Sequence, residues 1–386
     1  MKKILLGVLA TMALVSCSND EVLELNRAND EITFGVVTNK ATRAENVYCN
    51  NNMPTAFDVY ATHGSKTYIE GDQIKYEGGK WVNKSGTRYW PNTGDVKFFA
   101  HVNAGTDFSW NTTAPTIDDY VVPTDVAAQK DLLYAVKTQA KPTDGQVIMN
   151  FRHALSQIVF SAKNTNANLY VEISGVKVCH VGNTNTFTYP TEDTDEKLGE
   201  HNGGSTDFTG TAWGTWAPLT SGITTYPVSF DAVAVDGDNT VVSLTSANEA
   251  PKEYNSKAML LLPQTTTKWN TSVDADPDHS TGSYFLVNCL IYNVAGTSVD
   301  KTNDVCLWGT ENAGTYVAKE LAIPADFTWE QGKKYIYTFV FGKGNGGYDP
   351  NPDPTDPATP VLVPITFDIT VDDFIPVSGT EIESGL

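Results

Sequence analysis

Short segments in which apolar and polar residues alternate are the feature that most constrains the fold of this chain. The clearest is residues 365–374 (ITFDITVDDF), where Ile365, Phe367, Ile369 and Val371 share one face. Successive side chains of a β-strand point to opposite faces of a sheet, so this pattern predicts a strand with one buried and one solvated face. Similar runs, separated by turns rich in Gly, Asn, Asp and Pro, occur at residues 57–62, 68–83, 96–102, 241–244, 258–262, 284–292 and 335–341. The sequence therefore predicts an all-β protein built from antiparallel β-sandwiches.

Helical signals are almost absent. Only residues 125–137 (DVAAQKDLLYAVK) have helical propensity over more than two turns, and we expect at most a short helix there, with an extended chain from Leu132. Residues 151–162 (FRHALSQIVFSA) are apolar on both faces, which predicts a central position in a sheet. Residues 169–181 (LYVEISGVKVCHV) predict a further pair of strands.

The N-terminal residues predict export and lipidation. A basic start is followed by an apolar run at residues 4–15, which is too short to span a bilayer, and then by the small-residue site Val15-Ser16-Cys17. This layout is that of a secretory signal peptide covering residues 1–16. Cys17 matches the bacterial lipoprotein signal, in which the cysteine is acylated and becomes the new N-terminus; the alternative is an ordinary signal peptide that carries a cysteine. More than one acyl chain gives stable anchoring, so a triacylated Cys17 would attach the protein to the outer membrane.

An isolated strand follows the signal. Residues 18–31 are polar and acidic and predict a flexible tether. A period-two strand then places three apolar side chains on one face, those of Ile32, Phe34 and Val36. The polar segment after this strand contains the pair Arg43 and Ala44.

Charge and cysteine content exclude some functions and leave others open. The net charge of −20 argues against binding to nucleic acid, because that affinity depends on basic residues that neutralise phosphates. Beyond Cys17, an even number of cysteines in an exported chain permits two disulfides with three pairings, but we favour buried free thiols at Cys49, Cys179, Cys289 and Cys306. Their wide spacing gives no metal-binding pattern.

Residue patterns for catalysis or cofactor binding are not found. The six histidines lie in separate segments, and the glycine-rich run at residues 342–347 does not open a helix, as a phosphate-binding loop would. Acidic clusters such as residues 193–196 and 274–278 do not have the ligand spacing of a calcium loop and are expected to be solvated turns. We expect no enzyme, no cofactor and no metal. Three tryptophans near loops could stack on sugars, but we favour packing for Trp213, Trp216 and Trp269.

Several segments, in this order along the chain, resemble the fimbrillin family of pilin and pilus-associated lipoproteins of Bacteroidales. The lipoprotein signal, the Ile-x-Phe strand and the Thr-Arg-Ala site come first, and the chain ends with ITFDITVDDF. Between them lie YWP (89–91), FFA (98–100), KDLLYA (130–135), FRHALS (151–156), LLPQ (261–264) and WEQGKKY (329–335). The resemblance spans residues 17–374 and is thinnest at residues 190–250.

The resemblance implies two tandem transthyretin-like β-sandwich domains and no catalysis. With a boundary in the polar stretch at residues 190–215, we expect a lipidated tether and removable strand at 17–43, an N-terminal sandwich at 44–205 and a C-terminal sandwich at 206–386. It also implies that an arginine-specific protease cuts between Arg43 and Ala44 and removes the first strand. A strand from another pilin subunit would then fill the groove, since a sheet that lacks a strand is a template for strand addition.

The expected function is that of a pilus subunit or a pilus-tip adhesin, located in the fimbrium at the surface of the outer membrane and in contact with a host or bacterial receptor. The strand with Ile365, Phe367, Ile369 and Val371 is the candidate donor strand, although it could also be used within its own sandwich. The alternative is a monomeric surface lipoprotein that binds glycans, which would require Trp213, Trp216 and Trp269 to line one exposed platform. A hydrolase is the third reading, and it would need two carboxylates facing each other across a cleft.

Overall fold

The structure, a computed structural model, describes residues 30–38, 54–143, 146–194, 213–219, 223–245, 257–273, 281–343, 347–350 and 365–373. It is all-β, as the sequence predicts. Its described helices are two 3₁₀ turns, η1 (Gly105–Asp107) and η2 (Val126–Ala128). The side chain of Asp125 accepts a hydrogen bond from the amide of Ala127 and caps η2. The described part of the chain contains no helix that is long and apolar enough to cross a membrane.

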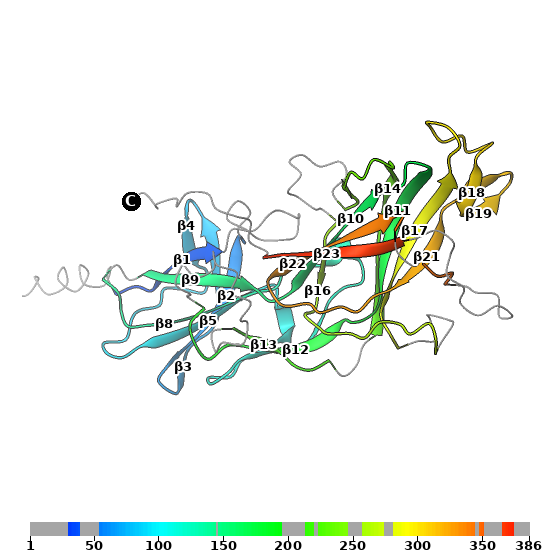
Figure 1. Cartoon of the computed structure of the whole chain (residues 1–386). Coiled ribbons are helices and arrows are strands. Elements are labelled where there is room, and N and C mark those ends of the chain that lie inside the picture. The colour runs from blue at the N-terminus through cyan, green and yellow to red at the C-terminus, as the bar shows by residue number, and fades with distance from the viewer. Residues whose placement is uncertain are drawn as a thin grey trace, which may run out of the picture.

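The first group of strands forms a seven-stranded sheet (Figure 1). Its order is β1 (Thr33–Thr38), β9 (Gln146–His153), β8 (Leu133–Gln139), β5 (Val96–Val102), β2 (Ala56–His63), β3 (Lys66–Glu77) and β4 (Lys80–Asn83). β1 pairs with β9 in parallel, whereas the other neighbours in this sheet are antiparallel. One face of the sheet surrounds a hydrophobic cluster, here called the first core, that includes Phe57, Phe98 and Phe151.

A small second sheet lies against the other face of the first. It contains β13 (Thr215–Trp216), β12 (Thr184–Thr188), β7 (Thr116–Val121) and β6 (Phe108–Ser109). Phe99 and Tyr134 of the large sheet pack with Ile117 and Phe187 of the small one, in a cluster here called the second core. The second core continues without interruption into the other half of the molecule.

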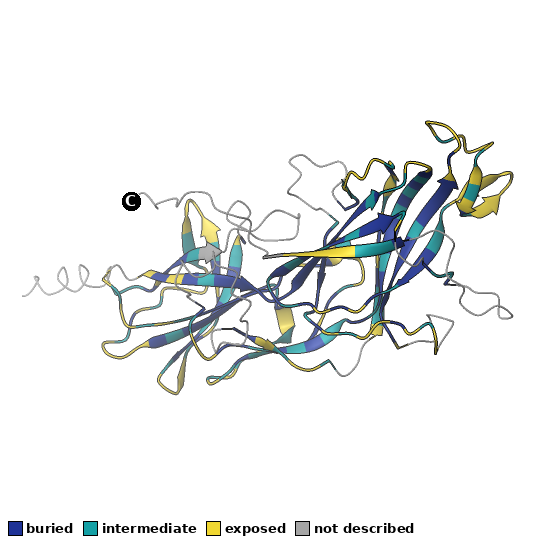
Figure 2. Ribbon diagram, viewed as in Figure 1, coloured by how far each residue is buried: buried dark blue, intermediate teal, exposed yellow. Residues whose placement is uncertain are grey.

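The second group of strands is a sandwich of two sheets. One sheet has the order β15 (Val242–Ser243), β10 (Ser156–Asn164), β22 (Lys333–Phe341) and β23 (Ile365–Asp373), and β16 (Met259–Leu261) also pairs with β10. The other has the order β14 (Ile223–Val235), β11 (Leu169–Gly182), β17 (Tyr284–Asn293) and β18 (Val305–Trp308), with β21 (Lys319–Pro324) also on β17. Phe160 of the first sheet and Phe285 of the second meet edge to face at 5.9 Å between ring centroids, so the inner faces pack directly. A hairpin of β19 (Thr310–Asn312) and β20 (Thr315–Val317) projects from one end, where Figure 2 shows mostly exposed residues.

Two sequence segments fold differently from what their patterns predict. The apolar run 151–162 is divided between two sheets, because β9 ends at His153 and β10 begins at Ser156. Residues 169–182, expected as a pair of strands, form the single strand β11. The pairing register shifts between Ile173 and Gly175, so Gly175 lies at an irregularity within a continuous strand and does not mark a turn.

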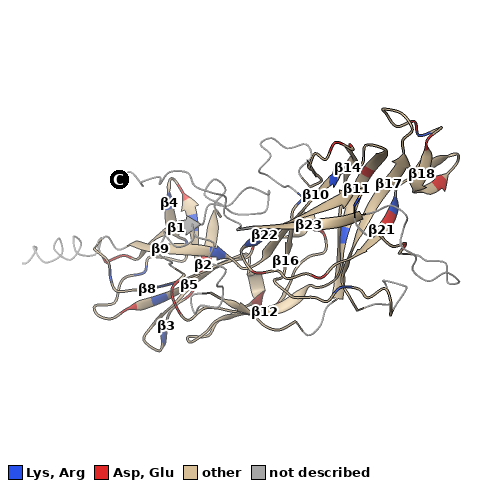
Figure 3. Ribbon diagram, viewed as in Figure 1, with Lys and Arg blue, Asp and Glu red and all other residues tan. Residues whose placement is uncertain are grey.

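The chain first passes from the first group of strands to the second at Ala154 and Leu155, before the predicted boundary between residues 205 and 206, and it returns to the small sheet at β12 and β13. β10, β11 and β12 precede that boundary, yet they bond with strands that follow it, including β22, β17 and β13. Charged residues are spread over both groups (Figure 3).

The described cysteines are free thiols, namely Cys179, Cys289 and Cys306; Cys49 lies outside the described residues. Burial raises the pKa of Cys179 to about 12 and also raises that of Cys289. Because the thiolate is the reactive form, we expect a thiol reagent to label the half-buried Cys306 first, and Cys179 and Cys289 only after unfolding. Peptide mass spectrometry over a time course measures this order. Equal labelling rates for all three in the native protein would contradict it.

His101 predicts a loss of stability at acidic pH. It is 2% exposed on β5, neither ring nitrogen has a hydrogen-bond partner, and the nearest carboxylate, Asp58, is 3.9 Å away. Burial lowers the pKa of His101 to about 4, so the unfolded chain, in which histidine titrates near its ordinary value, binds the proton more readily. Stability is therefore complete above about pH 6.5 and falls as the pH drops toward 4, by about 2 kcal/mol between pH 7 and pH 5.

Urea denaturation at both pH values, on the wild type and on His101→Phe, measures this contribution. The wild type should lose about 2 kcal/mol more than the variant between the two pH values. An equal loss in both proteins would show that His101 is not responsible.

Candidate functional site

The strand that the sequence singles out, β1, lies at the edge of the seven-stranded sheet. Six residues of β1 pair with β9, from Thr33 opposite Gln146 to Thr38 opposite Phe151. Figure 1 shows β1, in blue, beside β9. The pairing is parallel, so β1 and β9 do not form a hairpin. The covalent connection from β1 to the rest of the sheet runs through residues 39–53. Arg43 and Ala44 fall in that connection, outside the described residues.

The apolar face of β1 fills part of the first core. Ile32 is 5% exposed and Phe34 is 3% exposed, and Val36 packs against the same cluster from a half-buried position. The ring of Phe34 meets those of Phe57 and Phe98 edge to face, at 5.8 and 5.9 Å between centroids. Without β1, these aromatic rings would face solvent. The three positions that the sequence assigns to a removable strand thus form one row along the first core, buried at Ile32 and Phe34 and half-buried at Val36.

A second segment, residues 88–90, borders the beginning of β1 on the side away from β9. The amide of Ile32 donates to the carbonyl of Arg88 at 2.8 Å, and the amide of Trp90 donates to the carbonyl of Asp30 at 2.7 Å. Asp30 also forms an ion pair with Lys141. We call the surroundings of β1, formed by β9, residues 88–90 and the aromatic rings of the first core, the β1 seat. The β1 seat therefore has hydrogen-bonding groups on both sides of the strand and an apolar floor between them.

The candidate donor strand, β23, is an edge strand of its own sandwich. It pairs with β22 over nine positions, from Ile365 opposite Phe341 to Asp373 opposite Lys333. Ile365 is 2% exposed, and Phe367 packs on Phe285 with 5.5 Å between ring centroids. Farther along the strand, Ile369 is 46% exposed and Val371 is 52% exposed. The first half of β23 is thus packed within its own sandwich, and the apolar face of its second half is open.

β1 and β23 share a short sequence. Ile32-Thr33-Phe34 in β1 is repeated as Ile365-Thr366-Phe367 in β23, and each triplet continues with an aliphatic residue two positions later, Val36 or Ile369. Both strands therefore present the same order of side chains on their apolar face. This repeat is visible in the sequence and could have been found there by direct comparison of the two strands.

Three segments that carry the family resemblance meet where the two groups of strands join. The ring Nδ1 of His153 lies 2.9 Å from the carboxylate of Asp131 in a buried contact, and the amide of Gly332 donates to the carbonyl of Leu155 at 2.8 Å. The hydroxyl of Tyr134 donates to Gln331 at 3.1 Å. Segments 130–135, 151–156 and 329–335 thus form the connection between the two halves, which is a structural role.

The three tryptophans do not form a sugar-binding platform. Trp269 is 1% exposed in a small cluster with Tyr284, whereas Trp213 is 8% exposed and lies under the guanidinium of Arg152, 3.8 Å from its ring centroid. Trp216 packs against the second core, and its indole N–H donates to the carbonyl of Ala154 at 2.7 Å. The condition set for the glycan-binding alternative is therefore not met. Within the described residues, no group of three or more His, Cys, Asp or Glu residues could hold a metal ion.

Comparisons with known proteins show which proteins this chain is similar to. A search of curated proteins found no match. Among solved structures, a fimbrial protein from Bacteroides vulgatus aligns over 88% of this chain and 99% of its own, with 14% identity and a TM-score of 0.53. Two candidate cell adhesion proteins also match: one from Bacteroides uniformis, with 13% identity over 89% of this chain and 97% of its own and a TM-score of 0.41, and one from Parabacteroides distasonis, with 9% identity over 89% and 99% and a TM-score of 0.44.

The model of the fimbrillin-like family matches residues 42–352. This match covers most of the sequence, including the segment between β1 and β2 from Thr42 onward and nearly all of the second group of strands. The chain belongs to the fimbrillin-like family.

Proposed function

We propose that this protein is a pilus subunit or pilus adhesin that joins other subunits by strand replacement. Export as a lipoprotein through Cys17 would bring it to the outer membrane, and an arginine-specific protease would then cut between Arg43 and Ala44. The observation that carries the proposal is the β1 seat, in which an edge strand that precedes the cleavage site fills the first core. A cut at Arg43 leaves β1 bound to the sheet only by non-covalent contacts.

The β1 seat has the properties of an acceptor for a strand. Burial of each large apolar side chain contributes about 1.5–3 kcal/mol, so Ile32, Phe34 and Val36 provide most of the binding energy. The edge of β9 and residues 88–90 supply backbone hydrogen bonds that fix direction and register. An incoming strand must therefore run parallel to β9 and carry large apolar residues at three alternate positions.

β23 of another copy meets this requirement. With Ile365, Phe367 and Ile369 in the places of Ile32, Phe34 and Val36, the first two side chains are identical and the third is of the same class. To donate this strand, a subunit must release it from β22, and the exposed side chains of Ile369 and Val371 make its second half the weaker-held part. The structurally similar fimbrial protein supports assembly with other pilin subunits, and the fimbrillin-like family supports a location at the cell surface with access to a receptor.

Intact mass and N-terminal sequence of the protein recovered from cells, before and after treatment with an arginine-specific protease, test the proposal. The expected product begins at Ala44, lacks lipid and forms oligomers. Arg43→Ala should keep residues 32–36 covalently joined to the chain and stay monomeric, while Lys40→Ala should be processed like the wild type. A wild-type chain that still begins at lipidated Cys17 after the protease has acted would overturn the proposal.

A further inference from the structure

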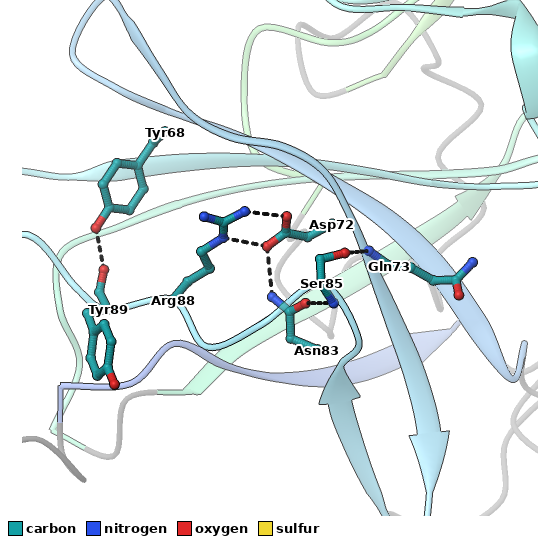
Figure 4. Close-up of polar contacts among 7 residues, drawn as sticks. All are labelled: Tyr68, Asp72, Gln73, Asn83, Ser85, Arg88 and Tyr89. Atoms are coloured by element: carbon teal, nitrogen blue, oxygen red, sulfur yellow. Dashed lines mark hydrogen bonds and ion pairs between the residues drawn. The ribbon is translucent and has the colours of Figure 1, made fainter.

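Residues 83–89 are attached to β3 by a continuous set of polar contacts (Figure 4). The guanidinium of Arg88 donates two hydrogen bonds to the carboxylate of Asp72 on β3, both at 2.7 Å. Asn83 donates a third hydrogen bond to the same carboxylate at 2.8 Å. The hydroxyl of Ser85 accepts from the amide of Gln73 at 3.1 Å. A loop that leaves β4 is thereby fixed along its length.

The two side chains of the Asp72–Arg88 pair differ in how far they are buried. Asp72 is 2% exposed, whereas the side chain of Arg88 is 41% exposed. Burial alone would raise the pKa of the Asp72 carboxyl, but the hydrogen bonds from Arg88 and Asn83 outweigh this effect and hold the pKa below its ordinary value. Asp72 is therefore ionised at neutral pH. Two parallel hydrogen bonds between a guanidinium and a carboxylate also fix the orientation of both groups, which a single charge contact does not.

The backbone that this pair holds is the backbone that contacts β1. The carbonyl of Arg88 accepts from Ile32, and two residues later the amide of Trp90 donates to Asp30. The hydroxyl of Tyr68, also on β3, donates to the carbonyl of Tyr89 between them. The ring of Trp90 packs on Phe98 at 5.8 Å, and Phe98 is one of the rings that contact Phe34. The side chain of Arg88 thus fixes residues whose main chain closes one side of the β1 seat.

We propose that Asp72 and Arg88 are positioning residues that hold residues 88–90 against the first strand and thereby control how fast that strand is released or replaced. This inference rests on the proposed function, since it concerns the exchange of β1. When the ion pair is intact, the amide of Trp90 and the carbonyl of Arg88 are prearranged for an incoming strand. When it is broken, residues 88–90 lose one of their attachments to β3, and the pairing with β9 carries more of the binding of the strand.

The test uses the full chain cut after Arg43, with its N-terminal fragment still seated. The fragment carries a fluorescent label, and an excess of unlabelled peptide DEITFGVVT, the sequence of residues 30–38, is added. We expect release of the fragment to be about tenfold faster or more in Asp72→Asn than in the wild type, since a charge-assisted bidentate pair is lost. Arg88→Lys keeps the charge without the paired geometry and should give an intermediate rate.

Controls separate positioning from general stability. Lys84→Ala removes a neighbouring ion pair with Glu77, in which both side chains are exposed, and should release the fragment at the wild-type rate. Hydrogen exchange of the amides of Ile32 and Trp90 should become faster in Arg88→Lys, while that of Phe98 in the sheet centre should not change, and this holds even if Asp72→Asn fails to fold. If the labelled fragment exchanges in the wild type, and Asp72→Asn and Arg88→Lys release it at the wild-type rate, this inference is overturned while the proposed function is not. A wild-type fragment that never exchanges with the peptide would instead overturn the proposed function.

Discussion

Replacement of Phe34 by alanine should lower the free energy of unfolding by about 3–5 kcal/mol, the usual cost of removing a buried aromatic side chain. Phe34 is 3% exposed and lies between Phe57 and Phe98, so truncation leaves a cavity that neighbouring strands cannot easily close. Urea denaturation of the uncut chain measures the loss. Thr33→Ala, on the exposed face of the same strand, is the matched control and should change stability by less than about 0.5 kcal/mol.

Phe34→Ala and Thr33→Ala should also differ in their rates of amide hydrogen exchange. Phe34→Ala is expected to increase exchange at the amides of β9 that pair with β1, from Gln146 to Phe151, because the edge strand opens more often. If Phe34→Ala were as stable as Thr33→Ala, β1 would not be an essential part of the first core.

Loss of the whole strand should have a larger effect than loss of one ring. A chain that begins at Ala44 lacks the side chains of Ile32 and Phe34, whose burial contributes about 1.5–3 kcal/mol each, and that of the half-buried Val36, which contributes less. We expect its first group of strands to melt at a lower temperature than that of the longer chain and to bind a dye specific for exposed apolar surface. The peptide DEITFGVVT should restore the melting temperature as its concentration rises, because a ligand that binds only the folded state stabilises it.

The matched control is the same peptide with aspartate in place of phenylalanine, DEITDGVVT, which should not restore the melting temperature. A shortened chain that melts at the same temperature as the longer one, with no response to either peptide, would contradict the description of the β1 seat.

The sequence was informative wherever the structure depends on local alternation. Ile365, Phe367, Ile369 and Val371 do share a face of β23, and β8 begins at Leu133, next to the predicted extended start, because period-two patterns and short helical signals are properties of neighbouring residues. Whether a strand continues or is divided by a turn was harder to predict. Residues 169–181 were expected to form a pair of strands, but a register shift accommodates Gly175 within the single strand β11.

Long-range pairing could not be predicted from the pattern. β1 pairs in parallel with β9, and β10 pairs in parallel with β22. In both pairs the two strands lie far apart in the sequence, so which strands pair depends on how the cores pack. For the same reason, the division of the apolar run 151–162 between two sheets was missed. Alternation along residues 32–36 predicts a strand with three apolar side chains on one face, but nothing in the local sequence connects Arg88 with Ile32, since that contact is made by backbone atoms.

The central claim is that β23 of one copy takes the place of β1 in another, and engineered disulfides test it most directly. Thr33 lies opposite Gln146, so the claim places Thr366 of the incoming strand opposite that residue. Copies with Gln146→Cys and copies with Thr366→Cys, both in a Cys306→Ser background, are mixed, treated with the protease and oxidised. The account predicts a disulfide-linked dimer of the two copies only after cleavage at Arg43.

Thr370→Cys provides the control for register, because it lies on the same face but about 13 Å farther along the strand, beyond the reach of a disulfide. A dimer that forms with Thr366→Cys and not with Thr370→Cys would establish the predicted strand, direction and register together. Processed oligomers that give no link between positions 146 and 366, or that link 146 equally well to 370, would contradict the account.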